Sequence, residues 1–243
     1  MGDFNLDLFH TYTEDDGRVE VVDFTDIDNG VGNRVVSIIN SLHVSDPTHP
    51  RNKRLAAFSK RAAADKVAMG EFESPRRFLM ALSKQGKDKI ELPCVYITRD
   101  PNWVYAEPDK YTDVCGVADL MDGDGNYAGT ADYSVVTLSY QVNIVGWQSD
   151  NINALATLIT QWLRQPNKAH TFKYKTRLAE VNMEMDAHVT DRKMVTVDSA
   201  SLPFEDDKLR VLSVNITVDA EILSVRYGSE HRAEIRVKGD QYE

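Results

Sequence analysis

The stretch LSYQVNIVGWQSDNINALATLITQWL (Leu138–Leu163) decides the predicted fold, because a strand pattern passes directly into a helix pattern within it. Over Ser134–Trp147 apolar and polar residues alternate, which is typical of a β-strand with one buried face. A polar link then leads into a helix over 151–164, where apolar residues, Trp162 among them, recur every three or four positions. Pro166 ends this helix. The segment therefore predicts a strand followed at once by an amphipathic helix.

Residues on both sides extend this unit into a sheet. Downstream, Glu180–Val189 alternates again, Leu209–Leu223 predicts a long strand, and 231–238 is a candidate last strand. Upstream, Lys89–Thr98 predicts a strand in which Pro93 marks an edge or a bulge. These elements predict an α/β (α+β) fold, with a mixed, mostly antiparallel sheet flanked by helices.

The first third of the chain is less regular. The pattern predicts a strand over Arg18–Thr25, a short helix over Asn33–Leu42, and an Ala-rich helix over Arg54–Met69. A further helix is expected to begin at Ser74-Pro75 and to end near Gly86. We divide the chain into an N-terminal region (1–87), an α/β core (88–238) and a polar tail (239–243), and expect one structural unit.

Composition restricts the classes of function. The 243 residues carry 28 Lys and Arg against 38 Asp and Glu, a net charge of −10 that argues against a general nucleic-acid binder. Apolar runs are too short to span a membrane, so no membrane partner is expected. A secretory signal pattern is absent and two cysteines cannot form a disulfide framework, which favours assembly in a reducing cytoplasm.

The charges are unevenly distributed. Residues 1–30 hold nine acids against one base, and residues 51–89 hold eleven Lys and Arg against four acids. Two interpretations stay open. The two segments are separate solvated faces, or the acidic arm docks on the basic segment, within one chain or on a neighbouring copy. Asp15 and Asp16 are the arm residues that we expect at such a contact.

The motifs examined favour no enzyme, and we expect no catalytic residue, no bound cofactor and no metal. The stretch that begins at Asp122 resembles the start of a calcium loop, but Tyr127 and Tyr133 occupy positions that need glycine and an acid. A hairpin turn is the preferred interpretation. Gly30 and Gly32 suggest a dinucleotide loop, but Val35 stands at the third glycine position. A site assembled from distant residues stays open as an alternative.

The polar face of the strand over Ser134–Trp147 is the strongest candidate site. It carries no charge, whereas a solvated sheet face usually carries Lys or Glu. Its members are Thr137, Ser139, Gln141 and Asn143. Uncharged β-forming residues suit a covered surface. The cover is either a helix of the same chain or another subunit, and in the second case these four residues are interface residues.

The order of these elements resembles a known family. Leu138–Leu163 gives a strand that runs into an amphipathic helix, and KMVTVDSASLPFEDDKLRVLSVNITVDAEI (Lys193–Ile222) gives a short strand, an acidic loop and a long strand. KIELPCVYITRD (Lys89–Asp100) supplies the upstream strand with its embedded proline. Together they resemble the tail-completion, or tail terminator, proteins of contractile-tailed bacteriophages, such as the T-even-like tail sheath stabiliser. The resemblance covers residues 88–223, and 1–87 have no counterpart.

This resemblance implies a structural protein of the virion, assembled in the host cytoplasm as a homohexameric ring. Such a ring caps the tail tube and sheath at the head-proximal end and docks the neck and head-closure proteins, and a closed ring stops further addition of subunits. Its acidic wall would let DNA pass through the lumen without binding. The alternatives are a head-closure or neck adaptor protein and, in a different class, a cytosolic ligand-binding domain or enzyme.

Overall fold

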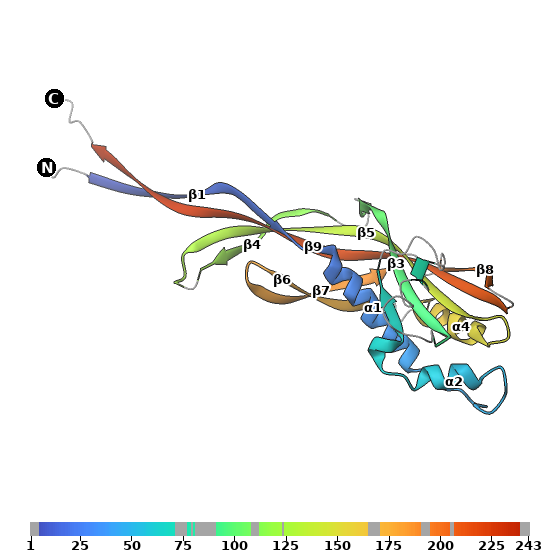
Figure 1. The fold of residues 1–243 in the computed structure, drawn as a ribbon. Helices are drawn as coiled ribbons and strands as arrows, with labels where there is room; N and C mark the ends of the chain where they lie inside the picture. Colours follow the sequence, from blue (N-terminus) through green and yellow to red (C-terminus); the bar gives the residue numbers. More distant parts are fainter. Residues whose placement is uncertain are drawn as a thin grey trace, which may run out of the picture.

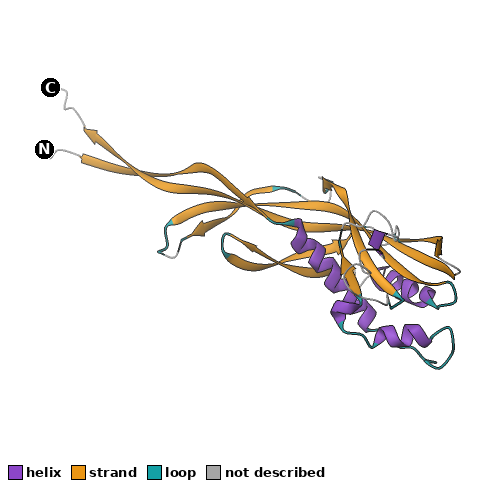
Figure 2. Ribbon diagram, viewed as in Figure 1, coloured by secondary structure: helices purple, strands orange, loops and turns teal. Residues whose placement is uncertain are grey.

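The computed structural model describes residues 5–70, 77–78, 80, 91–107, 112–122, 124–164, 171–190, 195–204 and 207–238. Within these ranges, strands outweigh helices (Figures 1 and 2). The elements, in chain order, are β1 (Asn5–Val21), α1 (Phe24–Asn40), α2 (Lys53–Ser59), the 3-10 turn η1 (Ala63–Asp65), β2 (Val67–Met69), β3 (Cys94–Tyr105), β4 (Val114–Met121), β5 (Tyr127–Trp147), α4 (Ile152–Arg164), β6 (Thr171–Leu178), β7 (Val181–Val189), β8 (Thr196–Phe204) and β9 (Asp207–Lys238).

The described strands form one curled sheet whose path runs β2-β3-β5-β9-β7-β6. The long strands β5 and β9 lie at its centre and pair antiparallel from Gly129↔Tyr227 to Trp147↔Leu209. The other edge of β9 is paired in turn by β8, β7 and β1, and β4 pairs with β5. Because β2 and β3 are parallel while the other strand pairs of the described residues are antiparallel, the predicted mixed, mostly antiparallel sheet is confirmed.

The first helix begins earlier than predicted. The expected strand over Arg18–Thr25 is wrong beyond Val21, because Asp23 accepts a hydrogen bond from the backbone N–H of Thr25 and caps α1. The expected helix over Asn33–Leu42 is the second half of α1. Gly30, part of the rejected dinucleotide motif, lies inside this helix, where an added Cβ would stand 2.5 Å from the Cβ of Tyr174. The glycine therefore permits close packing of α1 on β6.

The Ala-rich stretch after residue 53 is the largest departure from the prediction. The expected helix over Arg54–Met69 is wrong in its second half: α2 ends at Ser59, and β2 pairs in parallel with β3. Tertiary pairing overrides helix propensity here. The helix expected from Ser74 to Gly86 falls almost entirely outside the described residues. Phe78, which is described, is buried and stacks on Tyr96 with ring centroids 4.3 Å apart.

The buried face of the β5·β9 pair changes along its length. In the part that we call the body, where β5 136–147 pairs with β9 209–220, the even-numbered positions face α1 and α4; these include Val136, Leu138, Val142, Ile144, Val214 and Val218. In the outer part, where β5 129–135 pairs with β9 221–227, Ala131, Val135 and Val225 are buried, all at odd positions. The β6–β7 hairpin lies at this second face, since the Ala179 backbone N–H donates to Glu20 and the Asp186 N–H donates to Glu221.

Beyond Tyr227 the sheet narrows to a two-stranded ribbon, formed by β1 residues 5–15 and β9 residues 228–238. The register begins with Asn5 opposite Lys238, and a bulge between Asp15 and Val19 marks the root. Figure 1 shows the ribbon pointing away from the body, with α2 at the opposite end of the molecule. Within the same chain, β1 therefore does not dock on residues 51–70, the continuously described part of the basic segment. Docking on a neighbouring copy stays a prediction.

Candidate interaction surface

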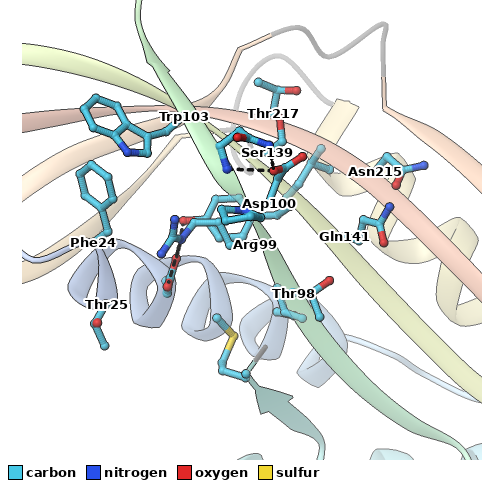
Figure 3. A pocket seen from close by; sticks show the side chains of 18 of the residues that line it. Phe24, Thr25, Thr98, Arg99, Asp100, Trp103, Ser139, Gln141, Asn215 and Thr217 are labelled. Carbon is cyan, nitrogen blue, oxygen red and sulfur yellow. Dashed lines mark hydrogen bonds and ion pairs between the residues drawn. The ribbon is translucent and has the colours of Figure 1, made fainter. Parts of the chain in front are cut away.

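A hollow of about 1190 Å³ opens where α1, β3, β5 and β9 meet (Figure 3). β3 shapes it, because its register against β5 shifts between Arg99 and Trp103. Asp100 accepts hydrogen bonds of 2.9 Å from both the backbone N–H and the side-chain amide of Asn102, which holds this bulge. A β-bulge changes the direction of the side chains beside it. Here the bulge lies between the charged residues of the hollow, which we call the wall, and its uncharged residues, which we call the floor.

The charged wall joins α1 to the sheet. The Arg99 Nε donates to Asp28 at 3.0 and 3.3 Å, and the Tyr140 hydroxyl donates to Asp28 Oδ1 at 2.7 Å. Burial, followed by the nearby Asp28 carboxylate, raises the pKa of Tyr140 far above its ordinary value, so this hydroxyl stays a donor. The Arg99 guanidinium also lies 5.6 Å from the Phe24 ring centroid. Asp28, Arg99 and Tyr140 therefore form a hydrogen-bonded network, which fixes α1 on β3.

An aromatic rim borders the hollow. The rings of Phe24 and Trp103 meet edge to face with centroids 5.3 Å apart, and Trp103 meets Tyr105 at the same distance. Trp103 and Tyr105 keep 42% and 57% of their surface exposed. Exposed aromatic residues that are fixed by ring contacts are typical of protein–protein interfaces.

The floor of the hollow contains two of the residues that the sequence singles out. Ser139 and Gln141 are exposed, and cross-strand pairing places Thr217 beside Ser139 and Asn215 beside Gln141. Thr98 of β3 continues this row on the other side of Gln141. The described α-helices do not cover Ser139 or Gln141, so cover by a helix of the same chain is wrong for this pair. A subunit contact stays a prediction.

The other two residues of the predicted face lie in closed surroundings. Thr137 is half-buried and donates to the buried carboxylate of Asp219 at 2.6 Å. Asn143 is 4% exposed, and its Oδ1 accepts a 2.6 Å hydrogen bond from Ser213. The uncharged face is therefore divided, with a closed end at Asn143 and an open stretch at Ser139 and Gln141.

The two acidic candidates lie at the ribbon root, far from the hollow. Asp15 pairs in register with Gly228, the first β9 residue of the ribbon. Asp16 accepts hydrogen bonds from the backbone N–H and the Nε of Arg18 at 2.9 and 2.8 Å, which hold the pKa of that carboxyl below its ordinary value. The structure therefore does not bring these acids together with the strand residues of the predicted site.

The stretch that resembles a calcium loop is a turn. Asp122 accepts hydrogen bonds from the backbone N–H groups of Asp124 and Asn126 at 2.9 and 2.8 Å, and Gly125 has a φ of +83°. The predicted hairpin turn between β4 and β5 is confirmed. Within the part of the chain that the structure describes, no three His, Cys, Asp or Glu side chains gather as a metal-binding group.

Sequence reasoning missed the wall and the rim of the hollow. Asp28 and Arg99 lie far apart in the chain, and no local pattern links them. Trp103 offered a weak signal, since it is an aromatic residue just beyond a predicted strand and two positions after Pro101. The β-bulge that brings Trp103 to Phe24 is a tertiary feature.

Comparisons with known proteins leave the chain without an assigned family. No protein-family model matches it, and no curated protein matches it significantly. Among the described residues, no helix combines the length and the apolar character needed to cross a membrane.

Proposed function

We propose that this chain is a structural, non-catalytic subunit of a contractile phage tail, assembled as a ring at the head-proximal end of the tube and sheath. The observation that carries this proposal is the open, uncharged stretch at Ser139 and Gln141, in a hollow that the exposed Trp103 also lines. An exposed aromatic residue and exposed uncharged polar residues in one hollow have the composition of a subunit contact. The strand–helix unit β5–α4 and the terminal strand β9, on which the resemblance to tail terminators rests, are neighbours in the sheet and core, which also supports it.

The mechanism in this proposal is geometric. A ring of subunits presents different upper and lower surfaces, so its lower face caps the growing tube and its upper face receives the neck proteins. The net charge of −10 supports a lumen that repels the phosphates of passing DNA. We expect purified protein in negative stain to show closed rings with a central hole. Monomers at tens of micromolar concentration would contradict the proposal.

A second candidate is a ligand-binding domain, and the hollow itself favours it. Its volume, its polar floor and the Arg99–Asp28 pair suit a small polar molecule. Native mass spectrometry separates the two candidates. A monomer that carries a bound small molecule supports this second function, whereas a ligand-free ring supports the first.

A further inference from the structure

Four polar side chains in the hollow have no hydrogen-bond partner among the described residues. They are Thr98, Ser139, Gln141 and Thr217, and we call them the polar grid (Figure 3). Ser139 and Gln141 are exposed, and Thr98 and Thr217 are half-buried. The donors and acceptors of the polar grid are therefore available to a ligand that enters the hollow.

The same sheet face pairs its polar side chains just outside the polar grid. Thr137 donates to the buried Asp219 carboxylate, and Asn143 accepts from the Ser213 hydroxyl, each at 2.6 Å. These pairs close the face where it is covered. The unpaired side chains, by contrast, gather in a concave part of the surface, which is where proteins bind small molecules.

Strand register fixes the layout of the polar grid. Thr98 of β3 lies opposite Gln141 of β5, and Ser139, two positions away, lies opposite Thr217 of β9. Neighbouring strands are about 4.8 Å apart and alternate residues about 6.8 Å apart, so the polar grid measures about 10 Å by 7 Å. The hollow, at about 1190 Å³, exceeds the roughly 300–1,000 Å³ of an ordinary small-molecule pocket. Its occupant is therefore an extended molecule with polar groups along its length.

The charges around the hollow disfavour an anionic ligand. The Arg99 guanidinium is already paired with Asp28, at 3.0 and 3.3 Å. Asp100 is exposed within the hollow, and Asp198 accepts a 2.6 Å hydrogen bond from Asn215 of the lining. Among the described residues, no Lys or Arg forms an ion pair with Asp100 or Asp198. Their negative charges repel phosphate and carboxylate groups.

The chemistry of the lining matches a neutral sugar chain. Hydroxyl and amide side chains both donate and accept hydrogen bonds, as sugar hydroxyl groups do, whereas an ammonium group only donates. Trp103 lines the same hollow and is 42% exposed, and its ring meets Phe24 edge to face with centroids 5.3 Å apart (Figure 3). A fixed aromatic ring of this kind offers an apolar surface to the C–H face of a sugar ring. An oligosaccharide presents both kinds of group along one chain.

We propose that the hollow binds a neutral oligosaccharide, with its hydroxyl groups on the polar grid and a C–H face of one sugar unit against Trp103. The inference deepens the second candidate function, ligand binding, and rests on it rather than on the ring. Because the proposed ring contact also uses Ser139 and Gln141, the unassembled chain is the form that binds the saccharide.

Titration calorimetry with the full chain tests the class of ligand. The probes are three neutral tetrasaccharides (maltotetraose, cellotetraose and N-acetylated chitotetraose) and the anionic tetragalacturonate. At least one neutral probe should bind with a dissociation constant of about 1 mM or less, and tetragalacturonate should bind at least tenfold more weakly. Failure of all three neutral probes to bind in this range, or equal binding of the anionic probe, would overturn the proposal.

Matched glutamine variants locate the site. Gln141→Ala removes an amide that both donates to and accepts from the ligand, so binding of the neutral probe should weaken about tenfold. Gln148→Ala removes an exposed glutamine directly after β5 and outside the hollow, and should change binding less than twofold. Thermal unfolding of both variants should match wild type, because both side chains are exposed. Equal effects of the two substitutions on binding would place the ligand elsewhere and contradict the proposal.

Negative-stain images of the same samples separate this inference from the ring. Monomers that bind a neutral tetrasaccharide would support the inference and refute the ring. Rings that dissociate as the saccharide is added would support both. Rings whose subunits bind no saccharide, either assembled or after dilution to monomers, would overturn the inference and leave the ring intact.

Discussion

The body and the outer part of the β5·β9 pair use the same two strands but differ in the faces they bury. The body buries its even-numbered face and, at its far end, also the odd-numbered Val145, Leu209 and Val211, whereas the outer part buries odd-numbered residues alone. In the body the even-numbered residues pack under α1 and α4, and Gln141 on the odd face is exposed. In the outer part Val225, an odd-numbered residue, is buried, and Arg226 beside it is paired with Asp132 on the other face. An unbroken strand register can therefore serve two layers of cover. The helices and the hairpin that pack on the sheet determine which of its faces is buried.

The body should show the largest effect of a core truncation. Ile144 is fully buried among α4 and the central strands, so Ile144→Ala should lower the free energy of unfolding by about 4 kcal/mol. Gln141→Ala, on the exposed face of the same strand, is the control and should change it by less than about 0.5 kcal/mol. Urea denaturation measures both. Similar losses in the two variants would remove the distinction between the faces.

The closed and open ends of the uncharged face should differ in their tolerance of charge. Asn143→Lys buries an unpaired ammonium and removes the acceptor of Ser213, so the free energy of unfolding should fall by about 3 kcal/mol or more. Gln141→Lys leaves its charge in water and should preserve thermal stability. Differential scanning calorimetry of the two variants is the measurement. A stable Asn143→Lys protein would mean that this end of the face is open as well.

A smaller effect is expected from the core of the outer part. Val225 is buried under a hairpin rather than under helices, and Val225→Ala should lower the free energy of unfolding by about 2 kcal/mol. Ser224→Ala tests the opposite face of the same strand and should be close to neutral. If Ser224→Ala proved the more damaging of the two in chemical denaturation, the change of buried face would be disproved.

The smallest effect should depend on pH. Hydrogen bonds from Arg226 hold the pKa of Asp132 below its ordinary value, so the ionised carboxylate stabilises the fold by about 1 kcal/mol. This contribution is complete above the unfolded-state pKa of about 4 and is lost as the pH falls through the lowered folded-state pKa. Urea denaturation of wild type and Asp132→Asn from pH 7 to pH 3 should give a difference that shrinks toward zero. A constant difference would assign the effect to something other than ionisation.

Local patterns predicted the elements of the body well. The alternation over Ser134–Trp147 and the helical spacing over 151–164 reflect burial against one layer, and both elements are present, although Trp162 is half-buried and lies at the margin of the core. Prediction from local patterns was less accurate where contacts between distant segments determine the secondary structure. The strand β2 forms in an Ala-rich stretch because β3 offers it a backbone partner.

The candidate site was less predictable than the fold. Ser139 and Gln141 could be singled out as candidates because a missing charge on a strand face is a local signal. The Arg99–Asp28 pair and the contact of Phe24 with Trp103 join segments far apart in sequence, and one sequence alone contains no record of such contacts. The change of buried face has the same origin, since it depends on where the β6–β7 hairpin lies.

The length of β9 has a consequence for synthesis of the chain. β5 leaves the ribosome well before β9, its partner along its entire body and most of its outer part. During that interval one long edge of β5 has free backbone donors and acceptors, and such an edge readily pairs with strands of other molecules. β1 remains without its partner for the longest time after synthesis, because that partner, β9, is the last strand to be made. Contacts this distant in sequence slow folding, so a nascent chain of this protein should depend on chaperones until its final strand is complete.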